Sequence, residues 1–179
     1  MRCSLRLTNH ERLPWRTWQR PDAPLDPISA AATGLGLALR LWREAPPLRE
    51  GGTVVLLHDF HAAFARGHSP FRTLFQALRD GRERTPAGET RGAVLADRQA
   101  LSAYRAGRAP HPLLAHAEWA SCGPALARCG RVIVAGCRDA AAARALGFVP
   151  SHSVRAAIEM ARGVAGGAHR LGVLLAPPY

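Results

Sequence analysis

The chain has 179 residues, of which 47% are hydrophobic and 21% charged, and this balance predicts one folded domain and excludes a disordered chain. The net charge is +11, and every one of the 24 basic residues is an arginine. Guanidinium groups bind phosphates well, but here they are spread over the whole chain and aromatic residues make up only 6%. Nucleic-acid binders cluster their charge and interleave aromatic residues, so this pattern argues against a nucleic-acid partner.

The cysteines and the apolar runs indicate the compartment. Cys3, Cys122, Cys129 and Cys137 form no Cys-x-x-Cys pair and follow no secretory leader, so neither a zinc knuckle nor a disulfide framework is indicated. No apolar run reaches the roughly 18 to 20 residues that span a bilayer. We therefore expect a cytoplasmic protein with reduced thiols and no membrane contact.

The beginning of the chain divides into a weakly patterned segment and the first helix of a layered domain. Residues 1–23 carry little periodicity, although Cys3 to Thr8 alternates as a short strand does. From Ile28 to Arg43 apolar residues recur at helical spacing. Gly34 and Gly36 lie inside that predicted helix, where glycine lowers helix stability relative to alanine. We expect a strand or a ligand to approach them closely.

A buried strand and a second helix follow. Thr53 to Leu57 is a continuous β-branched and aliphatic run, which is typical of a strand covered on both faces. The helix predicted from Phe71 to Arg79 has Pro70 in its first turn and Ser69 as its N-cap.

The middle of the chain, residues 80–129, reads as a loop and a helical excursion. Residues 81–92 are polar and glycine-rich, which predicts an exposed loop. Helical patterns follow at 96–106 and 113–129, the second interrupted near Gly123.

The last part of the chain alternates between strand and helix patterns. We predict strands at 131–135 and 171–175, and helices at 140–146, ended by Gly147, and at 154–164, capped by Ser151 or Ser153. Repeated alternation of strand and helix predicts the α/β class, with a parallel sheet flanked by helices on both faces.

Titratable side chains gather directly after the first predicted strand. His58, Asp59, His61 and His68 form the densest such group in the sequence. In open α/β sheets ligands bind beyond the carboxyl ends of the strands, so these residues are candidates for a pocket. Their spacing matches no established zinc pattern, and polar residues also follow buried strands for structural reasons. The histidines of the later segment HPLLAHAEW, His111 and His116, could face either the pocket or solvent.

Three segments carry a family resemblance: GGTVVLL, RVIVAG and ALGFVPSHSVRAAIEMARGVAG. Together they resemble the C-terminal domain of the nickel-pincer lactate racemases, from about Pro24 to the end of the chain. The resemblance implies an α/β domain over residues 24–179 that belongs to an isomerase of 2-hydroxy acids. In that family an N-terminal domain supplies the histidine metal ligand and the lysine that tethers the pyridinium-derived cofactor, and nothing in this chain corresponds to it.

The resemblance also sets expectations for single residues. Pro24, Leu25 and Asp26 match the family's Pro-Leu-Asp turn, but its Gln and Lys positions fall on Ala31 and Gly34, which can neither bind a carboxylate nor supply charge. We therefore expect no cofactor in this chain alone, and a nickel-pincer nucleotide only if a separately encoded N-terminal domain supplies its site. A bare domain of this kind also predicts self-association through an uncovered apolar face.

These observations lead to one set of candidate residues and three functions. We expect proton transfer by His58 or His61, and binding of a small carboxylate by arginines and by Asp26, Asp59, His68 and His111. The first function is a racemase-like domain that is not competent alone. The alternatives are a non-catalytic remnant or small-molecule-binding module and an arginine-rich nucleic-acid-binding protein.

Overall fold

A computed structural model places most of the chain downstream of the weakly patterned segment. The residues it describes are 26–37, 48–64, 68–81, 90–165 and 170–172. Segment 1–23 and the strand predicted at Cys3 to Thr8 lie outside the described residues.

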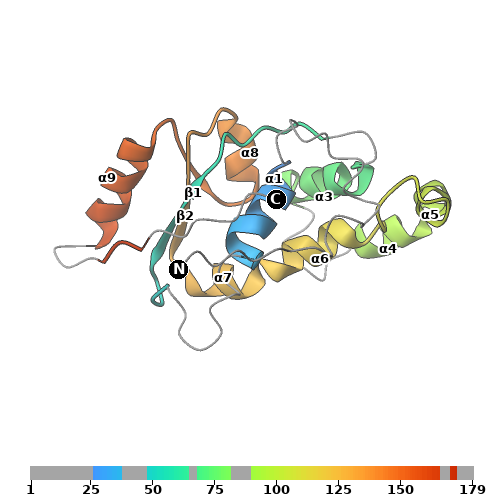
Figure 1. The fold of residues 1–179 in the computed structure, drawn as a ribbon, viewed down its shortest axis with the longest axis horizontal. Helices are drawn as coiled ribbons and strands as arrows, with labels where there is room; N and C mark the ends of the chain where they lie inside the picture. The colour runs from blue at the N-terminus through green and yellow to red at the C-terminus, as the bar shows by residue number, and fades with distance from the viewer. Residues whose placement is uncertain (1–25, 38–47, 65–67, 82–89, 166–169, 173–179) are drawn as a thin grey trace, which may run out of the picture.

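The described residues form one parallel sheet of three strands, in the order β1 (Thr53–Leu57), β2 (Arg131–Ala135), β3 (Val149–Ser151) (Figure 1). Val55 lies opposite Ile133 in the β1–β2 pair, and Ile133 lies opposite Val149 in the β2–β3 pair. The predicted α/β class is confirmed. Strand β2 is central and buried along most of its length, whereas the residues of β1 are half-buried or exposed.

Helices cover both faces of this sheet. They are α1 (Pro27–Ala31), η3 (Ala32–Leu37), α3 (Ser69–Arg79), α4 (Thr90–Ala96), α5 (Arg98–Arg105), α6 (Leu114–Ser121), α7 (Gly123–Arg128), α8 (Ala140–Ala145) and α9 (Val154–Ala165). On one face α9 packs Ala157 against Ile133 and Ala135. On the other face Val132 and Val134 join a larger core with residues of α1, α3, α6 and α8. None of the described helices is long and apolar enough to cross a membrane.

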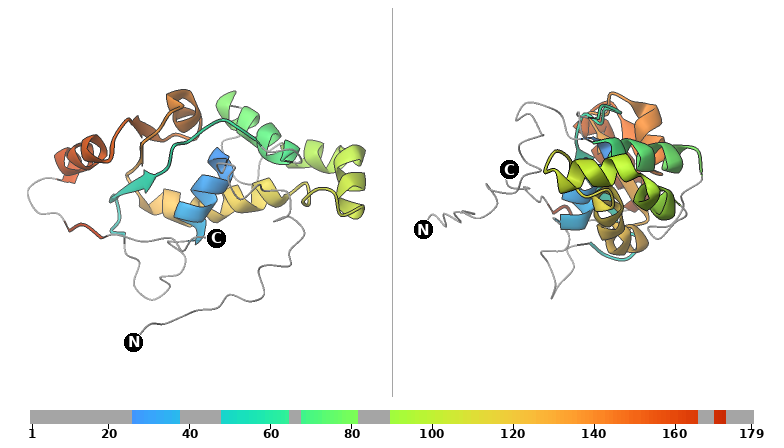
Figure 2. Two further views of the ribbon diagram at one scale, coloured as in Figure 1. Left: turned by 45° about the horizontal axis from the view of Figure 1, so that its top comes forward. Right: turned by 90° about the vertical axis from the view of Figure 1, so that its right-hand side faces the viewer.

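Helices α4 to α7 form the predicted excursion between β1 and β2. Figure 2 shows α4 and α5 at the end of the molecule opposite α9. Helix α4 begins at Thr90, so the predicted loop 81–92 extends too far; residues 82–89 lie outside the described residues. The break near Gly123 is confirmed, because α6 ends at Ser121 and α7 begins at Gly123.

The first helix changes its winding halfway along. It begins at Pro27 in α-helical form and continues as a π-helix from Ala32 to Leu37; residues 38–43 of the predicted helix lie outside the described residues. A side chain at Gly34 would meet Leu56 of β1, whose Cδ2 lies 2.5 Å from the position of a Cβ atom. At Gly36 it would meet the Ser121 hydroxyl of α6. The expected close approach of a strand is confirmed for Gly34, whereas the close neighbour of Gly36 is a helix.

Two details of the predicted elements are wrong. Ser69 is the first residue of α3 and not its N-cap; His68 occupies the cap position without a capping side-chain hydrogen bond. Strand β3 was not predicted, because Pro150 lies in its middle and proline cannot donate to a strand ladder. Of the two candidate caps for α9, Ser153 accepts from the Ala156 N–H, while Ser151 belongs to β3.

The predicted strand 171–175 is not formed at its start. Leu171 and Gly172 have no strand structure, and Leu171 is 69% exposed. Residues 173–175 lie outside the described residues.

Substituting Gly130 tests the close pairing of the segments that lead into β1 and β2. The Gly130 N–H donates to the Gly52 carbonyl at 2.9 Å, and an added Cβ would lie 2.6 Å from the Gly51 carbonyl oxygen. Because that atom is backbone, we expect Gly130→Ala to lower the free energy of unfolding by about 1 to 3 kcal/mol. Gly123→Ala, where an added Cβ meets nothing within 4 Å, is the matched control. Urea denaturation of both variants measures the difference, and equal stabilities would contradict this packing.

Candidate functional site

The pairing of β1 with β2 continues beyond the strands, where polar residues begin. The His58 N–H donates to the Ala135 carbonyl at 3.1 Å, and the Cys137 N–H donates to the Ser151 carbonyl at 3.0 Å. Gly136 turns the chain after β2 with a φ of 81°. The segments that follow all three strands therefore lie side by side at the carboxyl edge of the sheet.

Three of the predicted site residues meet at this edge. His61 Nε2 lies 3.2 Å from Asp59 Oδ2, and His58 Nδ1 lies 3.5 Å from Asp59 Oδ1. The side chains of His58, Asp59 and His61 are 23%, 37% and 34% exposed, so a small ligand can reach all three. We call His58, Asp59 and His61 the edge cluster.

Backbone hydrogen bonds hold the edge cluster against the loop between β2 and α8. The Arg138 N–H donates to the Asp59 carbonyl at 2.7 Å, and the Asp139 N–H donates to the Phe60 carbonyl at 3.3 Å. Asp139 is itself fixed, because its carboxylate accepts from the Ala142 N–H at the start of α8. The backbone that carries the cluster is therefore hydrogen-bonded to the loop before α8.

His58 is neutral at pH 7 in one tautomer. Its Nδ1 accepts a hydrogen bond from the Phe60 N–H at 3.0 Å, so the ring hydrogen of the neutral form lies on Nε2. Burial lowers the pKa of His58, and the nearby Asp59 carboxylate opposes this only in part. His58 therefore offers an N–H donor to a ligand.

Asp26, predicted to bind substrate, lies in the interior. Its Oδ1 accepts from the N–H groups of Ile28 and Ser29, both at 3.0 Å, and caps α1. Its Oδ2 accepts from the Ser29 hydroxyl at 3.0 Å and lies 3.2 Å from His68 Nδ1. The side chains of Asp26 and His68 are 1% and 7% exposed, so a ligand reaches them only if α1 and α3 separate.

His68, the other predicted substrate-binding residue of this region, joins two helices. It stacks on Phe71 of α3, with ring centroids 4.9 Å apart, while it pairs with the N-cap of α1. A buried polar pair of this kind needs further hydrogen bonds to offset desolvation, and Asp26 has them.

The Ser29 hydroxyl lies between two carboxyl groups. Its oxygen is 3.0 Å from Asp26 Oδ2 and 3.3 Å from Glu118 Oε2, yet the hydroxyl carries one hydrogen and can donate to only one of them at a time. The separation to Asp26 is the shorter one, and Asp26 also accepts from backbone N–H groups and faces His68. We call Asp26, Ser29, His68 and Glu118 the buried cluster.

The pKa of Glu118 is raised in this setting. Burial and, to a smaller extent, the charge of Asp26 raise it from 4.5 to about 7, while the Ser29 hydrogen bond acts in the opposite direction. The charge of Asp26 also acts on His58, where it is the smallest of the four influences and opposes the lowering of the pKa by burial.

His111, the last predicted site residue, has its contacts within the helical excursion. Its Nδ1 accepts from the Leu113 N–H at 3.1 Å, and its ring meets Tyr104 edge to face at 4.8 Å. No hydrogen bond or ring contact of the described residues joins it to the edge cluster.

Sequence reasoning missed Ser29 and Glu118 of the buried cluster, and it missed Phe60, which contacts His58 of the edge cluster. The Asp26-x-x-Ser29 spacing is a capping pattern and could have indicated Ser29. Glu118 comes from a distant helix and Phe60 from an unusual backbone conformation, and neither has a local signal in the sequence.

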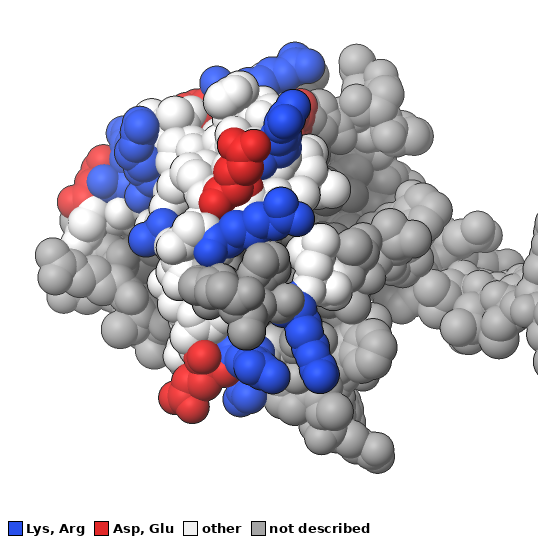
Figure 3. Space-filling view, turned by 90° about the vertical axis from the view of Figure 1, so that its left-hand side faces the viewer, with Lys and Arg blue, Asp and Glu red and all other residues white. Residues whose placement is uncertain are grey.

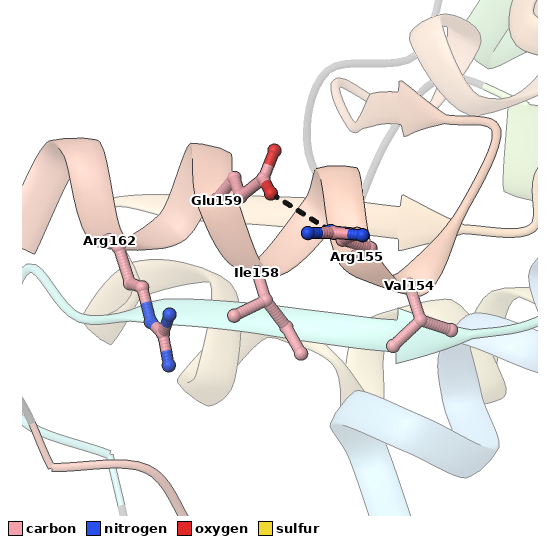
Figure 4. A pocket seen from close by; sticks show the side chains of 5 residues that line it. All are labelled: Val154, Arg155, Ile158, Glu159 and Arg162. Atoms are coloured by element: carbon pink, nitrogen blue, oxygen red, sulfur yellow. Dashed lines mark hydrogen bonds and ion pairs between the residues drawn. The ribbon is translucent and has the colours of Figure 1, made fainter.

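An open hollow of about 440 Å³ lies along α9, lined by Val154, Arg155, Ile158, Glu159 and Arg162 (Figure 4). Arg155 and Glu159 pair across one helical turn at 3.3 Å. None of the predicted site residues lines this hollow. The surrounding face shows arginines interspersed with acidic side chains (Figure 3).

The described residues do not fit a metal cofactor. They bring together no group of three His, Cys, Asp or Glu side chains that could hold a metal ion, and the sequence has no lysine to tether a pyridinium cofactor. Comparison of the chain with known protein families, with curated proteins and with solved structures gives no match.

The contribution of the buried cluster to stability can be measured by comparing its N-cap, Asp26, with an exposed N-cap that makes the same two hydrogen bonds. Asp97 accepts from two backbone N–H groups at 3.0 Å at the start of α5, as Asp26 does for α1, but Asp97 is exposed. We expect Asp97→Ala to lower the free energy of unfolding by about 1 kcal/mol. Asp26→Ala also strands His68 in the interior, so we expect a loss of about 3 kcal/mol or more. Equal losses in chemical denaturation would show that His68 adds nothing.

The stability of the protein should fall as Glu118 ionises. A carboxyl group whose pKa is raised in the folded state contributes stability that is complete below its unfolded pKa of 4.5 and is lost as pH rises through about 7. We expect Glu118→Gln to remove this loss, of about 2 kcal/mol between pH 5 and pH 8. The measurement is urea denaturation of both proteins at each pH. A constant difference between them across this range would contradict the assignment.

Proposed function

We propose that this chain is the C-terminal half of a racemase-like enzyme that acts on a 2-hydroxy acid or a related small carboxylate, completed by a separately encoded N-terminal domain. The observation that carries the proposal is the edge cluster: two imidazoles flank one carboxylate at the carboxyl edge of a parallel sheet, where ligands of such sheets bind. The resemblance of the segments around β1, β2 and α9 to the nickel-pincer lactate racemases supplies the reaction class.

His61 is suited to accept a proton. With a hydrogen on Nε2, neutral His61 donates to Asp59 at 3.2 Å and keeps the lone pair of Nδ1 for a ligand hydroxyl group. The Asp59 carboxylate orients the imidazole and stabilises the imidazolium that forms when the proton is taken up.

His58 and Arg138 are suited to bind the carboxylate of the same ligand. Neutral His58 has its hydrogen on Nε2 and can donate it to a carboxylate oxygen. Arg138 is exposed, and its N–H is hydrogen-bonded to the Asp59 carbonyl. Its side chain therefore leaves the backbone beside the edge cluster. A carboxylate and an adjacent hydroxyl are then bound by two donors and one acceptor.

The described residues of this chain do not themselves hold the cofactor of the racemases. Because the chain lacks the tethering lysine and the described residues hold no metal-binding group, the described residues do not fit the nickel-pincer nucleotide. The partner domain would have to carry it.

A small-molecule-binding module is the second candidate, and the packing of α1 and η3 supports it. Ala31 and Gly34 stand where the family has Gln and Lys; Ala31 is fully buried, and Leu56 occupies the space beside Gly34. These positions serve packing, which leaves the edge cluster to bind a ligand without the racemase side chains.

The ligand-binding role of His61 can be tested on the purified chain. We expect titration calorimetry at pH 8 to detect binding of lactate or another 2-hydroxy acid, and His61→Ala to weaken it about three- to tenfold, the effect of losing one hydrogen bond to the ligand hydroxyl group. His152→Ala is the matched control, because His152 is exposed on the loop after β3.

The outcomes separate the two candidates. Binding that His61→Ala weakens and His152→Ala does not, followed by racemisation when the chain is combined with an N-terminal partner, supports the racemase-like enzyme. The same binding without racemisation supports the binding module. Absence of binding to every 2-hydroxy acid tested would overturn both.

A further inference from the structure

Phe60 has a backbone conformation that its residue type does not favour. Its φ is 43°, and among the described residues it is the one non-glycine residue with a positive φ. This left-handed conformation costs an L-residue about 1 to 2 kcal/mol, and such residues concentrate at functional sites because the surrounding structure must hold them.

Four contacts hold Phe60 in place. Its ring is fully buried, 6.1 Å from the ring of Phe148. Its carbonyl accepts from the Asp139 N–H at 3.3 Å. Its N–H donates to His58 Nδ1 at 3.0 Å, while its ring meets the His58 ring edge to face at 5.6 Å and an interplanar angle of 85°.

Phe60 and Asp59 compete for the same nitrogen of His58. The Phe60 N–H requires a lone pair on Nδ1, whereas Asp59 Oδ1, 3.5 Å from Nδ1, would favour a hydrogen there. A change of Phe60 to a negative φ would turn its N–H away and leave Asp59 as the neighbour of Nδ1.

We propose that Phe60 is a positioning residue that keeps His58 in the Nε2–H tautomer, with its N–H donor directed at the ligand of the edge cluster. The tautomer and ring orientation of His58 follow from its contacts with Phe60. The direction of its N–H toward a ligand rests on the proposed function. Without Phe60, His58 shifts its hydrogen to Nδ1, pairs with Asp59 and presents a lone pair where the ligand carboxylate needs a donor.

Imidazole ¹⁵N NMR of the full chain tests the tautomer directly, without any ligand. In the wild-type protein at pH 8 we expect His58 to be at least about 90% Nε2–H, a tenfold preference. Phe60→Ala removes the ring that holds the left-handed backbone. In this variant we expect the Nδ1–H fraction of His58 to rise several-fold, and the pKa of His58 to increase as its pair with Asp59 forms. Phe60→Gly, which adopts a positive φ freely, should keep more of the Nε2–H tautomer than Phe60→Ala.

Phe75→Ala is the matched control, because Phe75 is a buried aromatic residue of the same core whose ring contact is with Phe64. It should lower stability while leaving the His58 spectrum unchanged. Phe60→Leu, which keeps apolar volume, replaces Phe60→Ala if the latter does not fold. A wild-type Nδ1–H tautomer, or tautomer populations that do not respond to Phe60→Ala or Phe60→Leu, would overturn the proposal. The NMR result and the calorimetric result are independent, so a tautomer set by Phe60 in a chain that binds no 2-hydroxy acid would refute only the proposed function.

Discussion

The candidate site depends on the pairing of β1 and β2 beyond the ends of the strands. The backbone ladder continues from Ala135 to His58 and then, through the loop before α8, to Asp59 and Phe60. Each of these bonds fixes a main-chain group beside a titratable side chain, so the separations within the edge cluster are set by the sheet. Loops that carry function are most effective when a rigid scaffold positions them in this way, and here the scaffold is the central, buried strand β2.

The buried cluster places a second group of titratable side chains in the core, in addition to the edge cluster at the surface. Asp26 accepts from α1, Ser29 and His68 and is enclosed by the core, so its charge acts through a medium that screens it less than water does. This charge acts on two groups: after burial, which is the larger cause, it helps to raise the pKa of Glu118 on α6, and it opposes the lowering of the pKa of His58 by burial. The carboxylate that caps α1 thus lies within electrostatic range of the edge cluster.

The sequence predicted the elements well and the site only in part, for reasons that differ between residues. Strands β1 and β2 follow from continuous β-branched and aliphatic runs, although β1 is half-buried or exposed and so less buried than its run predicted. His58, Asp59 and His61 follow from their place directly after β1. Asp26 and His68 were placed in one pocket with them because spacing along the chain does not show depth; the structure encloses both in the core. Glu118 enters only through tertiary packing, 89 residues from Ser29, and the φ of Phe60 depends on contacts with Phe148 and Asp139 that no local pattern encodes.

The packing of η3 explains why the loop after β1 carries the polar groups. Gly34 has no side chain, and this lets the helix approach Leu56, which lies two residues before His58 on the same chain. A long polar side chain at Gly34 would have to displace Leu56 and separate the helix from β1. Close packing on this side and ligand contacts from the same helix positions therefore exclude each other. The proposed recognition of a carboxylate is accordingly assigned to the edge cluster, in the loop between β1 and α3, and to Arg138, in the loop between β2 and α8.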